Sequence, residues 1–299
     1  MKILLFLQKW PGGVGVVVNS LKKEFLKKGH EVICISREDD LKKFSSVKNL
    51  FWLKKEYAKI ILRENPDIVY TQDWSMALPL IFSNKRTNQK HFCCFHGHQP
   101  GKSKAFQKGV GKIMGNKLIV VGDSLKKAYP RASLIYNGID LNLFKPDKEI
   151  KKIKNSVGFV NWKKEEYNYS YIKNACKKEG KIFLVAEGLS QKEMPDFYNS
   201  LEIFISLPPK YTGFNMSWLE AMSCGVPKII GNGFGVGKKI QITQIEDFSS
   251  LNEAMKKSEE KDYRKILKNS NKFSWEENAM KLLKLWKNDS IIVNLRTFK

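Results

Sequence analysis

The sequence contains few acidic residues, few cysteines and no long apolar run, and each shortage excludes a class of protein. No apolar stretch approaches the ~20 residues that a bilayer-spanning helix needs, so we expect no transmembrane helix. The first segment, MKILLFLQKW, lacks a small-residue cleavage site and is interpreted as a strand, not as a signal peptide. Five cysteines without a CxxC spacing argue against a disulfide framework and favour a reducing compartment. We therefore expect a cytoplasmic protein.

Basic residues, by contrast, are abundant. Lysine and arginine number 53 against 30 aspartates and glutamates, which gives a net charge of +23. Residues 1–140 hold 25 basic and 11 acidic residues, an excess of +14. Such a surface attracts nucleic acid, anionic lipid or phosphorylated substrates, although an AT-rich gene enriches lysine and asparagine in the same way. No zinc-finger spacing, basic zipper or RNA-binding aromatic signature accompanies the charge, so we expect no nucleic-acid partner.

Short apolar runs alternate with amphipathic stretches along most of the chain. Continuous apolar runs between helical patterns are typical of parallel strands covered on both faces, so the pattern predicts an α/β protein. The expected strands are 2–7, 31–36, 67–70, 91–95, 117–121, 133–136, 157–160, 181–186, 202–206 and 227–230. The expected helices are 14–28, 54–65, about 74–83, about 102–114, one from Asp123, about 165–178, about 191–200, about 214–224, and two or three within 246–287.

The alternation is interrupted at 137–156, a polar stretch that we interpret as a linker. We therefore predict two doubly wound, Rossmann-like domains that face a cleft, the first over 1–140 and the second over 141–273. A C-terminal helix at about 274–299 is expected to pack back onto the first domain.

The glycine-rich segments fail the common nucleotide-binding patterns. HGHQPGKS (96–103) has His96 where a P-loop needs glycine, and Val18 stands in place of the third glycine of a dinucleotide fingerprint. Gly12 and Gly13 nevertheless fall at the expected start of a helix, where free N–H groups favour anions. A plain tight turn is the alternative reading of these two glycines.

The most informative segment is YTGFNMSWLEAMSCGVP (211–227). Gly213 precedes the expected helix, and Gly225 with Pro227 ends it. A phosphate at the start of this helix would meet unpaired N–H groups. Glu220, about two turns further on, has the chemistry to accept hydrogen bonds from a ribose diol. Taken alone, such a glutamate is more often a solvated or capping residue.

Segment 211–227 resembles the donor-site signature of the retaining family 4 glycosyltransferases, which have the GT-B fold. YNGID (136–140), with Phe144 and Pro146, is similar to the interdomain element of that family. Weaker resemblances follow in the family's order at 10–32, 65–74, 91–98, 117–129, 194–207 and 273–283, so that the resemblance covers nearly the whole chain.

The resemblance implies a nucleotide-sugar donor on the C-terminal domain and an acceptor on the N-terminal domain. Glu220 would bind the donor ribose, and Gly13 would lie against the phosphate. His96 would approach the transferred sugar, with His98 as the rival candidate. The segment facing the diphosphate and sugar would be Gly213, Phe214, Asn215, Met216 and Ser217.

Two positions depart from the family pattern. In the family, seven residues separate two glutamates, and the first of these positions is Thr212 here. The family's diphosphate-binding arginine is replaced by Phe159, whereas Lys163 or Lys164 can supply the lysine. The expected donor site is completed by Gly12, Thr212, Lys163 and Lys164.

We therefore expect a glycosyltransferase that moves a sugar to a glycan or lipid-linked acceptor in cell-surface polysaccharide or lipopolysaccharide assembly. Retention of stereochemistry is expected, with no cofactor beyond the nucleotide-sugar substrate. No DxD-like pair follows a strand and no His/Cys cluster has metal spacing, so we expect no metal. The alternative is an inactive glycosyltransferase-like protein with a binding or regulatory role.

We also expect the N-terminal domain to dock on an anionic surface such as the inner leaflet of the cell membrane. The basic excess and several lysine pairs suggest this, with the first two pairs placed on the exposed face of the helix after Gly12 and Gly13. The pairs are Lys22-Lys23, Lys27-Lys28, Lys42-Lys43, Lys54-Lys55 and Lys126-Lys127.

Overall fold

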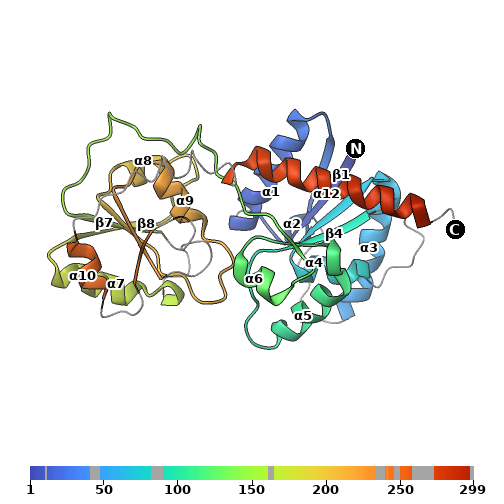
Figure 1. Cartoon of the computed structure of the whole chain (residues 1–299), viewed down its shortest axis with the longest axis horizontal. Helices are drawn as coiled ribbons and strands as arrows, with labels where there is room; N and C mark the ends of the chain where they lie inside the picture. The colour runs from blue at the N-terminus through green and yellow to red at the C-terminus, as the bar shows by residue number, and fades with distance from the viewer. Residues whose placement is uncertain are drawn as a thin grey trace. The chain divides into compact units, whose positions relative to one another are not determined.

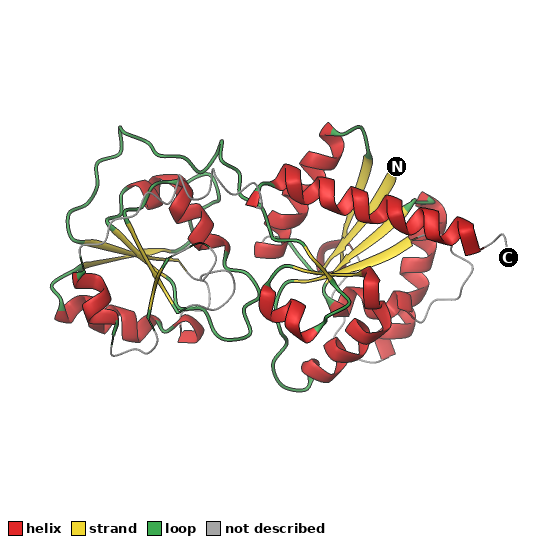
Figure 2. Ribbon diagram, in the orientation of Figure 1, coloured by secondary structure: helices red, strands yellow, loops and turns green. Residues whose placement is uncertain are grey.

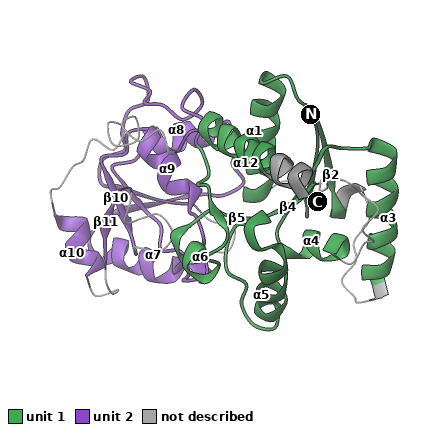
Figure 3. Cartoon of the chain, turned by 45° about the vertical axis from the view of Figure 1, so that its right-hand side comes forward, with its two compact units in different colours: residues 1–138, 275–299 green, residues 139–274 purple. Residues whose placement is uncertain are grey.

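The protein is an α/β chain of two compact units, shown here as a computed structural model (Figure 1). The structure describes residues 1–10, 12–40, 48–81, 90–160, 165–232, 240, 242–245, 250–257 and 273–296. One unit comprises 1–138 and 275–299, and the other comprises 139–274 (Figure 3). Within the described residues no helix is long and apolar enough to cross a membrane.

The first unit contains a six-stranded parallel sheet with strand order β2-β1-β3-β4-β5-β6. Helices cover both of its faces (Figure 2), which explains why β1 is apolar at nearly every position. Its elements are β1 (Lys2–Leu7), α1 (Gly13–Lys27), β2 (Glu31–Ser36), α2 (Arg37–Asp40), α3 (Lys48–Glu64), β3 (Ile68–Gln72), α4 (Trp74–Ile81), β4 (Lys90–Phe95), α5 (Ser103–Met114), β5 (Leu118–Val120), α6 (Asp123–Ala128) and β6 (Ser133–Leu134).

Two helical layers pack on opposite faces of this sheet. Leu4, Phe6 and Val69 of the strands form a buried cluster with Tyr57 of α3 and Met76 of α4. Helix α4 contacts both α3 and α5, so these three helices form one layer. The helix α3 begins at Lys48, earlier than the expected start at residue 54, because exposed apolar side chains at its N-terminal end obscure the amphipathic pattern.

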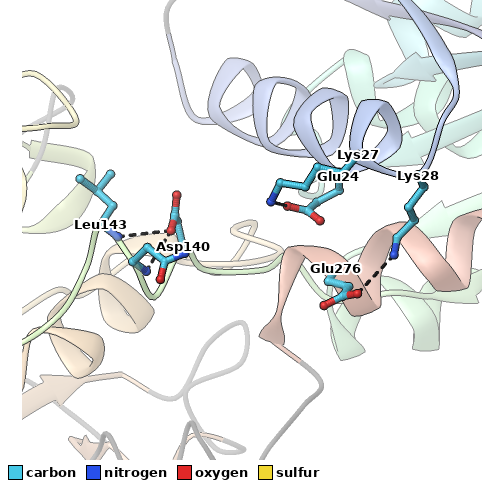
Figure 4. A network of polar contacts seen from close by, with 7 residues as sticks. Glu24, Lys27, Lys28, Asp140, Leu143 and Glu276 are labelled. Atoms are coloured by element: carbon cyan, nitrogen blue, oxygen red, sulfur yellow. Dashed lines mark hydrogen bonds and ion pairs between the residues drawn. The ribbon is translucent and has the colours of Figure 1, made fainter.

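The opposite face is covered by α1 and by the C-terminal helix α12 (Trp275–Arg296). The Trp286 side chain is fully buried and contacts the rings of Phe25, Tyr70 and Phe92. The Lys28 ammonium pairs with the Glu276 carboxylate at 3.3 Å, which joins the two helices at their ends (Figure 4). Residues 275–296 therefore complete the first unit, although they follow the second unit in sequence.

The second unit has a five-stranded parallel sheet of order β11-β10-β9-β7-β8. The Asp140 carboxylate accepts N–H bonds from Asn142 and Leu143 at its start (Figure 4). The elements are β7 (Ser156–Val160), α7 (Tyr169–Lys178), β8 (Ile182–Ala186), α8 (Met194–Asn199), β9 (Ile203–Ile205), α9 (Met216–Ser223), β10 (Lys228–Gly231), β11 (Thr243–Gln244) and α10 (Leu251–Lys256).

Close packing in this unit predicts a cost for adding one methyl group. A Cβ atom at Gly158 in β7 would overlap the fully buried side chain of Leu201. We expect Gly158→Ala to lower the unfolding free energy by about 1–3 kcal/mol in urea denaturation. Gly109→Ala is the control, because Gly109 is exposed on α5 and no atom lies within 4 Å of a Cβ built there. Since alanine is the better helix former, this variant is expected to keep or raise the unfolding free energy. Equal stability of the Gly158→Ala variant and the parent would contradict the packing described here.

Candidate functional site

The segment before α9 lies at the carboxyl end of β9, the edge of a parallel sheet where ligands bind in this class of fold. Asn232 donates its amide to the Pro208 carbonyl at 2.7 Å, and Asn168 donates to the Leu207 carbonyl at 3.2 Å. Residues 209 to 212 form a turn closed by the Thr212 N–H and the Pro209 carbonyl. These contacts hold the chain in a fixed path to the helix.

Asn215 is the residue that begins α9, and its side chain is engaged away from the helix N–H groups. Its amide donates to the Ser206 hydroxyl at 2.9 Å, and its carbonyl oxygen accepts from the Ser217 hydroxyl at 2.8 Å. The Asn215 side chain accepts no hydrogen bond from the backbone N–H groups of the first turn. The N–H groups at the start of α9 therefore point to the sheet edge without a side-chain cap, which favours an anion there.

The other residues of this segment differ in how far their side chains are buried. Phe214 is buried and packs against Phe273 at a ring-centre distance of 6.3 Å, so only its backbone is available to a ligand. Gly213 is also buried, whereas Thr212, Met216 and Ser217 are partly exposed. The structure thus brings the predicted segment together as one continuous edge.

Glu220 lies one turn into α9 and is held by a neighbouring helix. The hydroxyl of the fully buried Tyr198 on α8 donates to its carboxylate at 2.8 Å. Burial raises the pKa of Glu220 to about 7, against a smaller lowering by the Tyr198 hydrogen bond. Glu220 is therefore not the solvated residue that its place in an amphipathic helix suggests by itself.

Thr212 stands where the family has its first glutamate, and the residues around it contact another carboxylate, Glu166. Thr212 shares a side-chain hydrogen bond with Tyr167, and the Tyr211 hydroxyl donates to Glu166 at 2.7 Å. Glu166 and Tyr167 belong to a short 3-10 turn before α7. Sequence reasoning missed this carboxylate because it lies 45 residues from Tyr211 along the chain.

Lys163 and Lys164, the predicted diphosphate ligands, lie outside the described residues. The strand β7 that precedes them is described, and Phe159 in that strand is fully buried. Phe159 packs against Tyr169 and Phe183, so the residue at the expected arginine position is part of the core of this unit. The role of the two lysines stays a prediction.

In the other unit, Gly12 and Gly13 lie at the start of α1, as the sequence predicts. Gly12 has φ 148°, which favours glycine, and both residues are exposed. No atom lies within 4 Å of a Cβ built at either residue, so the backbone there is open to close approach. Their contact with a phosphate stays a prediction.

His96 lies directly after β4, and its Nε2 is 2.8 Å from the Gln72 side-chain oxygen at the end of β3. Burial lowers the pKa of His96 to about 4, so the ring is neutral at physiological pH. The neutral ring carries one proton, and the nitrogen that holds it decides whether Nε2 donates to Gln72 or accepts from it. The rival His98 is partly buried, and its pKa is lowered by burial and by Lys104.

The sheet edge of this unit also carries a carboxyl group that sequence reasoning missed. Asp73 follows β3 with φ 81°, and its carboxylate accepts from the Trp74 N–H at 2.7 Å and from the Gln99 amide at 3.2 Å. Burial raises its pKa to about 6. Asp73 lies within segment 65–74, but its carboxyl group was not predicted as a site residue, and the fold shows that it shares an edge with His96.

One cavity among the described residues of the second unit lies at the other edge of its sheet. This cavity of about 320 Å³ at the amino ends of β9 and β10 includes Ile203 and Lys228 in its lining, at the opposite edge from Gly213. Among the described residues no three histidine, cysteine, aspartate or glutamate side chains are grouped so as to hold a metal ion.

A family model matches mainly the first unit of the chain. Residues 11–143 match the family model Glycosyltransferase Family 4. No curated protein matches the chain by sequence. The matched segment includes Gly12, Gly13, Asp73 and His96, and the donor-site segment lies beyond it.

Several solved structures share the fold of the whole chain. Sucrose-phosphate synthase from Thermosynechococcus elongatus aligns with 97% of this chain and 99% of its own, at TM-score 0.77 and 13% identity. A glycosyltransferase from Rickettsia africae aligns with 96% and 98%, at TM-score 0.71 and 18% identity. HepE from Anabaena, solved in complex with UDP-glucose, aligns with 98% and 99%, at TM-score 0.62 and 13% identity. The predicted fold class is confirmed: the two units are the Rossmann-like domains of a GT-B fold.

The pKa of Glu220 predicts a pH-dependent stability that one substitution isolates. The pKa of Glu220 is about 7 in the folded protein and 4.5 in the unfolded chain. Between pH 4.5 and pH 7 the folded protein therefore binds the carboxyl proton more tightly than the unfolded chain does. The stabilisation is complete below about pH 4.5 and is lost as the pH rises through about 7. We expect Glu220→Gln to be more stable than the parent by about 1–3 kcal/mol at pH 8, and the difference to vanish near pH 5, in urea denaturation. A difference between the two proteins that does not change with pH would contradict this assignment.

Proposed function

We propose that the chain is a glycosyltransferase that moves a sugar, expected to be a hexose, from a nucleotide-diphosphate donor to a glycan or lipid-linked acceptor. The observation that carries the proposal is the pairing of Glu220 with Tyr198 beside the uncapped start of α9. The family match over residues 11–143 and the likeness to HepE, a protein solved with UDP-glucose, support it. We place the donor on the second unit and the acceptor on the first.

The donor site follows from the chemistry of nucleotide recognition. A carboxylate accepts hydrogen bonds from both hydroxyls of a ribose, and Glu220 is positioned for this by Tyr198. A diphosphate at the start of α9 would accept N–H bonds from the backbone of Gly213 to Ser217 and gain from the helix dipole. Ribose and diphosphate are adjacent in a nucleotide-sugar, as Glu220 and the helix start are adjacent in α9.

Transfer breaks the bond from the anomeric carbon to the diphosphate oxygen and forms one to the acceptor oxygen. Positive charge develops on the sugar and negative charge on the leaving diphosphate, which cations and N–H donors stabilise. We assign this role to the start of α9 and to Lys163 or Lys164, without a divalent metal. The leaving phosphate takes the acceptor proton, which fits transfer with retention.

We propose that this glycan or lipid-linked acceptor belongs to cell-surface polysaccharide or lipopolysaccharide assembly. The second candidate is a glycosyltransferase-like binding or regulatory protein, which Thr212 and the core residue Phe159 favour. Hydrolysis of nucleotide sugars in the absence of an acceptor separates the two, because a protein that only binds releases no free sugar.

Substitution of Glu220 tests the donor site. A charged hydrogen bond contributes ~1.5–3 kcal/mol, so Glu220→Ala is expected to raise the Kd for the nucleotide diphosphate at least tenfold in calorimetry. The matched control is Glu253→Ala, which removes an exposed helical carboxylate from the same unit and leaves the Kd unchanged. An unchanged Kd in a folded Glu220→Ala protein would remove the residue from the site.

The proposed metal-free diphosphate site makes a separate prediction. Lys163→Ala/Lys164→Ala is expected to lose at least tenfold in turnover, because an unneutralised diphosphate is a poor leaving group. Lys177→Ala/Lys178→Ala, at the end of α7, removes the same charge from the same unit as a control. EDTA is expected to leave turnover unchanged. Activity abolished by EDTA and restored by magnesium would show that a metal holds the diphosphate.

A further inference from the structure

The outer face of α3 exposes large apolar side chains, which a surface helix normally buries. Phe51 is 70% exposed, Leu62 73% and Trp52 39%, although the inner face of the same helix already supplies Tyr57 to the core. Phe51 and Leu62 lie on one side of the helix, eleven residues apart, so their exposure is a property of that face. An apolar face of this kind indicates an interaction surface.

The charges on this face are of one sign. Lys55, Lys59 and Arg63 are exposed between and beside the apolar residues. The two glutamates of the helix, Glu56 and Glu64, are largely covered and pair with Lys59 and Arg63. The exposed face of α3 therefore combines aromatic and aliphatic side chains with lysine and arginine.

The helix α5 repeats the combination. Phe106 is 54% exposed and Ile113 60%, seven residues apart on one side of the helix. The helix contains three lysines, Lys104, Lys108 and Lys112, and no acidic residue. Helix α4 contacts both α3 and α5, so the two faces belong to the same helical layer.

A basic cavity opens beside α5. It has a volume of about 370 Å³ and its lining contains Lys108, Lys112 and Arg131, with no carboxylate among the lining residues. Three cations at one cavity match an anionic phosphate group. The cavity thus agrees in charge with the exposed faces beside it.

We infer that the outer faces of α3 and α5 dock the protein on an anionic phospholipid bilayer. Phe51, Trp52 and Leu62 enter the interface, and the lysines meet the lipid phosphates, as in helices that lie in the plane of a membrane. Two copies of this chain are a poorer occupant, because a symmetric contact would bring Lys55 and Lys59 against like charges. Nucleic acid is poorer too, since aliphatic Leu62 and Ile113 give no stacking surface for bases.

The inferred surface differs from the one that the first two lysine pairs suggest, and of the expected pairs it keeps Lys54-Lys55 on α3. In α1, Lys22 and Lys28 are partly buried, and Lys28 pairs with Glu276 of α12. Leu26 is the only large apolar residue of α1 that is strongly exposed. Since α1 and α12 lie on the other face of the sheet from α3, the proposed surface is on the opposite side of the unit.

Vesicle sedimentation tests the charge contribution with a matched pair of variants. Lys55→Gln/Lys59→Gln changes α3, and Lys23→Gln/Lys27→Gln changes α1 by the same charge. In each pair both lysines are exposed and one of them pairs with a glutamate three residues earlier. At about 0.1 M salt we expect the α3 variant to bind vesicles of phosphatidylcholine with phosphatidylglycerol about 30-fold more weakly than the parent, and the α1 variant to bind like the parent.

The apolar contribution has its own pair. Phe51→Ser/Leu62→Ser is expected to lower binding at least tenfold, and Leu26→Ser on α1 to leave it unchanged. Equal losses from the α1 and α3 variants, or no preference of the parent for anionic over neutral vesicles, would overturn the inference. A dimer in ultracentrifugation that Phe51→Ser/Leu62→Ser abolishes would assign the face to a second copy instead. The vesicles contain no nucleotide, so failure here leaves the donor-site proposal standing.

Discussion

Partial burial of a carboxyl group in the first turns of α9 is the constraint on which the proposed donor site depends. Burial raises the pKa of Glu220 to about 7, and the Tyr198 hydroxyl offsets only part of that cost. The fold accepts the cost because α8 and α9 pack together over the second sheet, with Tyr198 and Trp218 fully buried. A ribose diol would supply the hydrogen bonds that water no longer provides, so the cost of burial becomes selectivity for a ligand.

Both units place polar groups where parallel strands end, and both use apolar strands to do so. In the first unit, two helical layers bury β1, β3 and β4, and the carboxyl ends of β3 and β4 carry the buried Gln72 and the partly exposed Asp73 and His96. The second unit does the same after β9, where Ser206 anchors Asn215. The sheet edge is therefore the common origin of the donor-side segment and of the polar group beside His96.

Much of the fold could be predicted from the sequence, because apolar runs and helical spacing report burial directly. The helix within segment 211–227 was also predictable, since Gly213 and Gly225 delimit a stretch that contains Glu220. The environment of Glu220 was not, because Tyr198 reaches it from another helix. Glu166 escaped prediction for the same reason, since Tyr211 is 45 residues away, and the Gln99 amide that contacts Asp73 is 26 residues away. The apolar outer face of α3 was missed because Phe51 and Leu62 look like core residues until Tyr57 is seen to fill the core.

The central claim is that the second unit binds a nucleotide-diphosphate sugar. A thermal-shift screen of this chain against a panel of such sugars tests it most directly, since a ligand at 100 times its Kd stabilises the folded state by about 2.7 kcal/mol. The account predicts that at least one member raises the Tm in a concentration-dependent way. No shift with any member of the panel at millimolar concentration would contradict it.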